Sequence, residues 1–250
     1  MASHGKHRHL KRLAAPKMQP IHRKAHVWLL NINPGPHAKQ MAIPLGVALR
    51  DILGLTTTGQ ETRKLLKSGD VLVDGRKTSD DKFPVGLMDV IFITKLNAGF
   101  TLLNKKGKFI SAKVDKKDSK LAKITGKRLI AGGKTQLTLH DGRNIVIPTA
   151  EKAGKSGKEE KESKGSNDSY AVGDTLRISI PSQKIMQHLP LQKGAHCYVF
   201  QGRHAGSIGT LQEIIEFEGI TRSNARIVTP HGEQITLKDY IFVVDSDFKI

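Results

Sequence analysis

Two glycine-containing segments have the residue types that bind nucleotide phosphates. Residues 132–135, Gly-Gly-Lys-Thr, end like a P-loop, but that motif needs a glycine five residues before its Gly-Lys pair, where this chain has Arg128. The glycines at 202, 206 and 209 are spaced GxxxGxxG rather than GxGxxG, and the sequence after them has a strand pattern instead of a helical one. Neither segment therefore predicts a nucleotide site.

The other side chains with catalytic potential lack partners at a suitable spacing. Asp80 and Asp81 are adjacent on an expected loop, and adjacency does not place two carboxylates face to face. Cys197 lies in an apolar run and is expected to be a small core residue. The histidines at 4, 7 and 9 have no neighbouring Cys or carboxylate with which to hold a metal. We expect no enzymatic activity, no cofactor, no metal and no small-molecule substrate.

Lysine and arginine are the remaining side chains of interest, and their positive charges can bind polyanions. The chain has 41 Lys and Arg against 23 Asp and Glu, a net charge of +18 and a pI of about 10.0. This balance favours nucleic acid over a membrane surface as the partner. Aromatic residues make up only 5% of the chain, whereas proteins that bind single strands rely on aromatic stacking. We therefore expect structured RNA or DNA, bound mainly through phosphates and shape.

The positive charge is concentrated in two parts of the chain. Residues 1–50 hold nine Lys and Arg and no acidic residue, and residues 101–150 hold twelve against three acidic residues. The fifty residues between them balance at seven against seven, and the last hundred are close to neutral. Two basic blocks predict a directed binding surface. We expect the N-terminal block and the 105–134 block to neutralise most of the phosphates.

The sequence also predicts a compartment. No apolar run approaches the length of a membrane-spanning helix, and no apolar segment of a secretory signal follows the basic N-terminus. One cysteine excludes an intramolecular disulfide and a multi-Cys zinc site, and it suits a reducing cytosol. We expect a cytoplasmic protein without a membrane partner.

Residues 1–42 have no helical or strand period and contain Pro16 and Pro20, so we expect a basic, extended arm. Its apolar residues, among them Leu10, Trp28 and Leu29, favour an arm that becomes ordered against RNA over a solvated, disordered tail. The expected RNA contacts of the arm are Lys6, Arg8, Lys11, Arg12, Lys17, Arg23 and Lys24.

Residues 43–92 follow a helix–helix–hairpin pattern. Apolar spacing predicts a helix over 45–53 and a second over about 60–67, and Asp-Gly at 74–75 predicts a hairpin turn. This unit resembles the αL-type RNA-binding module of a bacterial small-subunit ribosomal protein and of several RNA-modifying enzymes. The cations that it would present to RNA are Arg50, Arg63, Lys64, Lys67, Arg76 and Lys77.

From residue 93 onward the pattern is β. Short strands separated by glycine turns predict a β-barrel-like domain over 93–188, and we interpret the charge-balanced stretch 151–169 as a flexible loop within it rather than a domain boundary. In the last expected domain, 189–250, residues 193–211 resemble a KOW motif in an SH3-like barrel. The RNA contacts expected in these parts are Lys105, Lys106, Lys108, Lys127, Arg128, Arg143, Arg203 and His204.

Several segments in a fixed order together resemble the archaeal and eukaryotic small-subunit ribosomal protein family S4e, over essentially the whole chain. They are Arg8–Pro16, Gly35–His37, Pro44–Asp51, Val71–Gly75, Phe83–Ile91, His140–Asn144 and the KOW segment. The resemblance implies an α+β, multidomain, non-catalytic structural constituent of the small ribosomal subunit. Its partners would be small-subunit rRNA and neighbouring small-subunit ribosomal proteins. We expect an archaeal-type member, because the chain ends soon after residue 244.

Two other functions remain open at this stage. αL modules are appended to RNA-modifying enzymes, but such an enzyme would need a catalytic domain that residues 93–250 do not predict. A transcription or translation factor with a KOW motif would bind a polymerase or the ribosome only transiently. Stoichiometric sedimentation with small subunits would separate these readings.

Overall fold

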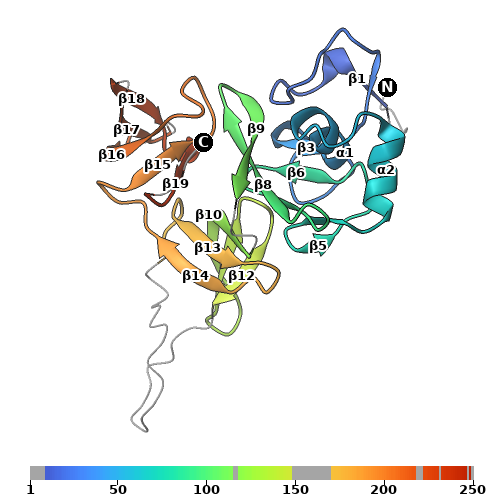
Figure 1. Ribbon diagram of the computed structural model, residues 1–250. Coiled ribbons are helices and arrows are strands. Elements are labelled where there is room, and N and C mark those ends of the chain that lie inside the picture. Colours follow the sequence, from blue (N-terminus) through green and yellow to red (C-terminus); the bar gives the residue numbers. More distant parts are fainter. Residues whose placement is uncertain are drawn as a thin grey trace, which may run out of the picture.

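The computed structural model describes residues 9–114, 118–147, 170–217, 222–230, 232–246 and 248. It is mostly β with few helices, and contains three five-stranded and two two-stranded antiparallel sheets (Figure 1). The predicted loop 151–169 and the predicted contacts Lys6 and Arg8 lie outside the described residues. Within the described parts of the chain, no helix is long and apolar enough to span a membrane.

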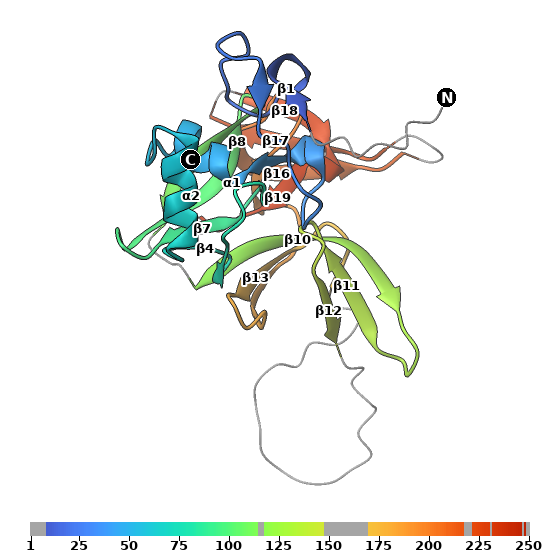
Figure 2. The ribbon, with the colours of Figure 1, turned by 90° about the vertical axis from the view of Figure 1, so that its right-hand side faces the viewer.

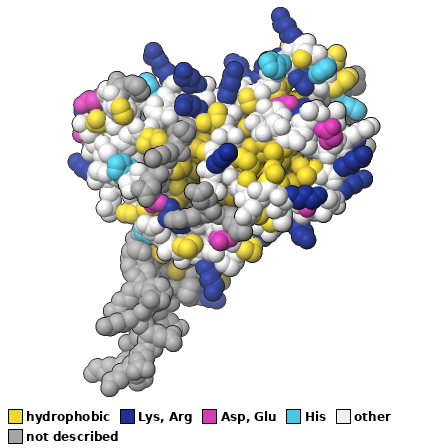
Figure 3. All heavy atoms as spheres, viewed as in Figure 1, with side chains coloured by type: hydrophobic (Ala, Val, Ile, Leu, Met, Phe, Trp, Pro, Cys, Tyr) yellow, Lys and Arg dark blue, Asp and Glu magenta, His cyan; other side chains and the backbone are white. Residues whose placement is uncertain are grey.

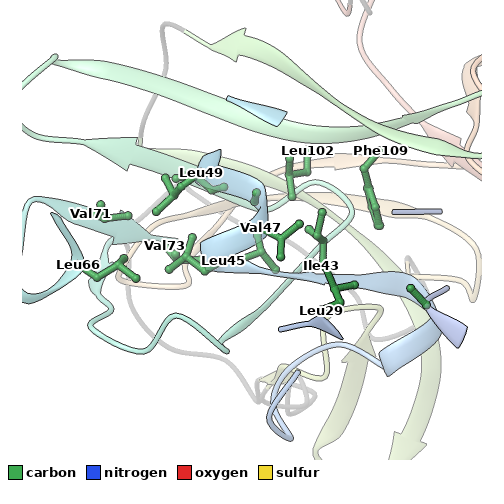
Figure 4. Packing of buried hydrophobic residues seen from close by; sticks show 14 of the residues in the cluster. Leu29, Ile43, Leu45, Val47, Leu49, Leu66, Val71, Val73, Leu102 and Phe109 are labelled. Atoms are coloured by element: carbon green, nitrogen blue, oxygen red, sulfur yellow. The ribbon is translucent and has the colours of Figure 1, made fainter. Parts of the chain in front are cut away.

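The first part of the chain folds around a five-stranded sheet with strand order β5-β4-β7-β8-β9. Its strands and those of the small β3–β6 sheet are β3 (Ala42–Pro44), β4 (Val71–Val73), β5 (Arg76–Lys77), β6 (Pro84–Gly86), β7 (Val90–Ile93), β8 (Ala98–Lys105) and β9 (Lys108–Val114). Buried side chains from the helices and from both sheets, such as Leu49, Leu66 and Leu102, form one core (Figure 4). The predicted boundary between residues 92 and 93 falls inside this sheet, because β7 and β8 pair as a hairpin.

Both predicted helices are present. The first runs over 45–52, as α1 (Leu45–Val47) continued by the wider turn of η3 (Ala48–Ile52), where the Leu53 amide donates to the Ala48 carbonyl at 3.0 Å. The second, α2 (Gly59–Lys67), begins with a capping box, in which Thr58 and Glu61 each bond the other's backbone amide. It buries Thr62 and Leu66 and turns its cations outward.

The N-terminal segment is folded against the protein, so the expectation of an extended arm is wrong for residues 9–42. It contains β1 (Leu10–Lys11), η1 (Arg12–Ala14), β2 (Trp28–Leu29) and η2 (Lys39–Met41). Leu10, Ala15 and Leu29 are buried in the first core. Leu10 and Leu29, two of the apolar residues that suggested ordering against RNA, thus pack on protein, since a core of this chain is available to exclude water from them, whereas Trp28 stays exposed.

The middle of the chain forms a second five-stranded sheet, β12-β11-β10-β13-β14. Its strands are β10 (Ser119–Leu129), β11 (Thr135–Leu139), β12 (Asn144–Ile147), β13 (Thr175–Ser179) and β14 (Ile185–Leu189). The first half of β10 pairs with β13 and the second half with β11, after an irregularity between Ile124 and Gly126. The β10–β11 hairpin extends away from the rest of the protein (Figure 2). Among the described strands β12 and β14 are edges, so the sheet is open where a barrel-like closure was predicted.

The last part of the chain forms the third five-stranded sheet, β18-β17-β16-β15-β19. Its elements are β15 (His196–Val199), β16 (Ile208–Ile215), β17 (Asn224–Thr229), β18 (Gly232–Leu237), η5 (Lys238–Tyr240) and β19 (Ile241–Val243). Cys197 is buried in its core, as the sequence predicts. Tyr198 and Phe242 face a further buried cluster with Met88 and Leu103, which joins this sheet to the first.

Candidate nucleic-acid interface

Three basic segments that are far apart in sequence meet at the turn between β8 and β9. The Phe109 amide, just after this turn, donates to the Met18 carbonyl of the N-terminal segment at 2.9 Å. The Lys106 amide donates to the Ala205 carbonyl of the β15–β16 turn at 2.8 Å. The exposed cations that these contacts gather define a surface that we call the basic edge: Lys17, Lys105, Lys106, Lys108 and Arg203, with the half-buried His204 beside them.

The approach of the two turns at the basic edge depends on a glycine. Gly206 has a φ of +99°, and a Cβ added there would lie 3.0 Å from the Cα of Lys105. Any other residue would both strain the backbone and push the β8–β9 turn away. Gly206, the second glycine of the expected KOW turn, therefore allows the turn to pack against a neighbouring hairpin of the same chain.

Buried hydrogen bonds fix the β8–β9 hairpin to the third sheet. The Tyr198 hydroxyl accepts from the Asn104 amide at 2.7 Å and donates to the Asn104 carbonyl at 2.6 Å. The side chain of Asn104 donates to the Phe200 carbonyl at 2.6 Å. Burial raises the pKa of Tyr198 well above its ordinary value, although the bond to Asn104 opposes this, so the phenol stays protonated and the basic edge is held in place.

A second basic surface lies on α2 and the β4–β5 hairpin, and we call it the α2 flank. Thr62 and Leu66 point into the core, so the opposite side of α2 faces solvent. The exposed cations of the α2 flank are Arg63, Lys64, Lys67, Arg76 and Lys77. In Figure 3 lysine and arginine side chains are visible along the upper edge of the molecule and over its right-hand side, where Figure 1 places α2.

Several predicted RNA contacts have partners within the protein. Arg12 is buried and its guanidinium donates to the His22 carbonyl at 2.8 Å and the Trp28 carbonyl at 3.4 Å. Arg23 donates to backbone carbonyls of residues 12–16. These two arginines hold the N-terminal segment in its folded shape, and their side chains are occupied by that task.

Acidic side chains pair with two further arginines predicted to bind RNA. Arg50 forms two hydrogen bonds with the neighbouring Asp51, at 2.8 and 3.0 Å. Arg63 on α2 lies 3.2 Å from Asp81. Both pairs are at least partly exposed, so each contributes little to stability and could exchange its carboxylate for a phosphate.

Lys127 and Arg128 are exposed, but they lie near the end of the β10–β11 hairpin, on neither the basic edge nor the α2 flank. Lys134, in the turn that joins the two strands, is exposed beside them and was not among the predicted contacts. Lys120 and Lys123, which belong to the same basic block, are buried. The block that was predicted to neutralise phosphates therefore divides into surface cations and internal ones.

Lys120 is the centre of a buried cluster of charged side chains, which we call the ion cluster. Its ammonium lies 2.8 Å from Asp74, 2.5 Å from Asp89 and 2.9 Å from Asp141. Arg143 completes the ion cluster, at 2.7 Å from Asp74 and 3.2 Å from Asp141. Asp74 lies in the β4–β5 turn and Asp89 just before β7, whereas Lys120 lies in β10 and Asp141 and Arg143 lie in the β11–β12 turn. The cluster therefore joins the first sheet to the second.

The charges of the ion cluster shift one another's ionisation. Burial alone would lower the pKa of Lys120, but the three carboxylates outweigh it and raise that pKa above its ordinary value. Burial likewise would raise the pKa of Asp89, but Lys120 and His37 lower it. The pKa of Asp74 is raised, because burial and the nearby Asp89 outweigh its cations. The cluster is thus a set of mutually dependent charges, in which removal of the single lysine leaves carboxylates facing each other.

Two histidines, His37 and His140, lie beside the ion cluster. His37 Nε2 lies 2.8 Å from Asp89, and its ring packs on Gly86, where an added Cβ would lie 2.4 Å from the ring. His140 Nδ1 accepts from the Lys123 amide at 3.2 Å, so Nε2 carries the proton and donates to the Leu87 carbonyl at 3.1 Å. Four of the segments that carry the family resemblance, around residues 35–37, 71–75, 83–91 and 140–144, therefore meet at this cluster.

Acidification is expected to weaken the junction through His140. Burial and the charge of Lys120 lower the pKa of His140 from 6.5 to about 4. The folded protein thus favours neutral His140, so its stabilising contribution is complete above pH 6.5 and is lost as the pH falls toward 4, by about 3 kcal/mol. Urea unfolding at several pH values should show this loss. The His140→Gln variant should lack it, and the exposed His26→Gln variant should keep it; an equal slope in both variants would contradict the assignment.

Lys123 links the second sheet to the third. Its ammonium donates to the carbonyls of Lys238 and Asp239, at 3.3 and 2.8 Å, and lies 5.9 Å from the centre of the Phe200 ring. Burial lowers the pKa of Lys123 to about 8. Such a lysine stabilises the arrangement of the sheets and is unavailable to a ligand on the surface.

Two hollows in the described parts of the chain lie beside the β15–β16 turn and the β8–β9 hairpin. One, of about 380 Å³, lies beside the β15–β16 turn and is lined by Gly202, Arg203, His204 and Tyr240 among others. The other, of about 680 Å³, lies between the β8–β9 hairpin and β10. It is lined by apolar residues such as Leu103, Ala112 and Phe248 and by charged residues such as Lys120, Arg177 and Asp245. Among the residues that the structure describes, no group of three or more His, Cys, Asp or Glu side chains could hold a metal ion.

Two family models match the sequence. The model of the Ribosomal family S4e matches residues 100–185, and that of the RS4NT (NUC023) domain matches residues 4–40. The first match covers most of β8 to the start of β14 and includes Lys120 and Arg143, whereas the second includes the described residues 9–40 of the N-terminal segment.

Archaeal proteins resemble the chain over almost its full length. The small ribosomal subunit protein eS4 of Methanosphaera stadtmanae is 40% identical over 250 residues, which cover 99% of this chain and 96% of the relative. The protein of the same name from Archaeoglobus fulgidus is 42% identical over 247 residues, 96% and 95% of the two chains. The crystal structure of the 30S ribosomal protein S4e from Thermoplasma acidophilum superimposes with a TM-score of 0.65 and 28% identity, over 83% of this chain and 96% of that one.

Proposed function

This chain belongs to the ribosomal family S4e, and on that premise we propose that it is a structural constituent of the small ribosomal subunit that binds and stabilises small-subunit rRNA. The family is not enzymatic, and the relatives are archaeal ribosomal proteins. We propose that the protein acts in the cytoplasm, on the ribosome, beside other small-subunit proteins.

The observation that carries the RNA-binding proposal is the basic edge. Three segments separated by about 90 residues each contribute cations to it, and hydrogen bonds between their backbones hold the segments together. Cations that only interact with solvent would not need three distant segments to be held together. Cations on segments that are held together in this way can bind a phosphate backbone with little loss of loop freedom.

We propose that the α2 flank adds a second contact, as an αL-type module over residues 43–92 would. The capped helix, the exposed cations of α2 and the adjacent hairpin support this. We propose similarly that residues 189–250 act as a KOW-bearing barrel, supported by the strand–glycine turn–strand geometry of β15 and β16. The central β domain, expected over 93–188, would then begin after β9, because β8 and β9 belong to the first sheet.

The salt dependence of RNA binding tests the proposed function. We expect the affinity of the protein for small-subunit rRNA to fall steeply with salt, with a log–log slope steeper than about −5, because several cations release counterions together. Filter binding at increasing KCl concentrations measures the slope. Large-subunit rRNA at equal concentration is the control and should bind more weakly. A flat salt profile would contradict the proposal.

A further inference from the structure

The N-terminal β1–β2 ribbon has one buried and one exposed face. Leu10 pairs with Leu29 and Lys11 with Trp28 across the two strands. Directly opposed residues of an antiparallel pair project to the same side, and successive residues alternate. Leu10 and Leu29 are buried in the first core, so Lys11 and Trp28 share the face that points away from it.

Trp28 is one of three large apolar side chains of the described N-terminal segment that are exposed. Trp28 is 58% exposed, Val27 63% and Leu13 71%. The ring of His9 lies 5.7 Å from that of Trp28, at an interplanar angle of 59°. A side chain of this size is normally at least mostly buried, and the same ribbon buries two leucines. An exposed indole therefore points to a ligand that covers it.

The surface is rigid before any ligand arrives. Arg12 donates to the carbonyl of Trp28 itself, and Arg23 donates to the carbonyls of Leu13 and Ala15. Leu10, Leu29 and Ala15 anchor the underside in the core. The internal roles of the two arginines thus fix the backbone that carries Trp28, which reduces the entropy lost when a ligand binds.

The charge around Trp28 selects a polyanion over an ordinary protein surface. Residues 1–50 contain no acidic side chain. Lys11 is the register partner of Trp28, and Lys17 and Lys24 are exposed on the same segment. A planar apolar ring beside a cation matches a nucleotide, whose base has a π face and whose phosphate is negative.

We propose that Trp28, with His9 beside it, is a stacking platform for one unpaired base of the bound RNA, and that Lys11 neutralises a phosphate next to that base. The inference rests on the proposed function and adds a ligand type to it. Stacking needs only the π face of a base, so the site would accept any of the four bases. It would also supplement the phosphate contacts, which do not distinguish paired from unpaired nucleotides.

Trp28 is the only tryptophan of the chain, so its fluorescence reports this site alone. We expect small-subunit rRNA to quench the emission, because a stacked base deactivates the excited indole, and the quenching should saturate together with filter binding. Trp28→Ala should weaken binding about 5- to 150-fold, which corresponds to the roughly 1–3 kcal/mol of one stacked base. Trp28→Phe should keep most of the affinity.

The salt slope separates the two parts of the site. Trp28→Ala should leave the slope unchanged, whereas Lys11→Gln should make it shallower by about 0.7, the value for one phosphate of a single strand. Phe217→Ala is the matched control. Phe217 is an exposed aromatic next to the exposed Glu216, so its removal should leave affinity and slope unchanged.

The outcomes distinguish this inference from the proposed function. If rRNA binds but the emission of Trp28 stays constant, the platform is refuted and the RNA-binding function stands. If the emission changes only when other small-subunit proteins are added, the surface is a protein interface and the platform is refuted again. If neither filter binding nor fluorescence detects rRNA, the proposed function fails, and the platform fails with it.

Discussion

Replacing Lys120 with methionine is expected to lower the free energy of unfolding by about 3–5 kcal/mol. Methionine has a similar length and is apolar, so the variant removes the charge without opening a large cavity. The ammonium lies within 2.9 Å of Asp74, Asp89 and Asp141 and is inaccessible to water. Without it, only Arg143 and His37 face the carboxylates, which repel one another in a region of low dielectric constant. Urea unfolding at pH 7 measures the loss.

The size of this effect depends on the charge, which a second variant can establish. Lys120→Met combined with Asp89→Asn removes one of the facing carboxylates and should be less destabilised than Lys120→Met alone. Lys127→Met is the matched control, since Lys127 lies on the same strand with its side chain exposed, and it should change stability by less than about 0.5 kcal/mol. If Lys120→Met unfolds like Lys127→Met, the ion cluster does not join the two sheets as described.

Neutralising the β8–β9 turn is expected to weaken binding to small-subunit rRNA about 10²- to 10³-fold at about 0.1 M salt. The variant combines Lys105→Gln, Lys106→Asn and Lys108→Gln. Asparagine suits position 106, because the backbone there has a φ of +50°. Three lost phosphate contacts should also make the log–log salt slope shallower by about 2 to 3. Filter binding over a range of salt concentrations gives both quantities.

A charge-matched control separates a local surface from net charge. Lys39→Gln, Lys184→Gln and Lys193→Gln together remove three exposed lysines that lie outside the basic edge and the α2 flank. This triple variant should bind rRNA within a few-fold of the unaltered protein. Equal losses in the two triple variants would mean that affinity follows total charge, and the basic edge would have no special role.

Local sequence patterns predicted much of the secondary structure. The helix at 45–52 follows from apolar residues at helical spacing, and its end follows from Gly54, which has a φ of +63°. The hairpin at 71–77 follows from Asp-Gly, since both residues adopt positive φ. The short strands β3, β6 and β14 were not predicted, because three to five residues without clear alternation carry too weak a periodic signal.

Contacts distant in sequence were the main source of error. Nothing local in residues 9–30 shows that Leu10 and Leu29 have a core to enter, so a folded segment looked like an arm. Lys120 looked like its exposed neighbours, since burial of one lysine requires three aspartates from three other segments. The one available signal was that Asp74, Asp89 and Asp141 each occur inside a segment of the family resemblance.

The same lesson applies to the candidate interface. Counting cations along the chain assigned the charge to two blocks, but folding distributes it differently. It unites Lys17, Lys105 and Arg203 on the basic edge, and it takes Arg12 and Lys123 into the interior. The net charge therefore predicted the type of partner, while the tertiary contacts decide which cations remain at the surface.

Sedimentation with ribosomal subunits tests the central claim most directly, namely that this protein is a structural constituent of the small subunit. The basic edge, the α2 flank and the exposed face of the β1–β2 ribbon would bind rRNA together, so release requires several contacts to break at once. We predict that the protein co-migrates stoichiometrically with small subunits in a sucrose gradient, and that it stays bound after a salt wash that removes transient factors. Release into the supernatant by that wash, or migration with large subunits, would contradict the account.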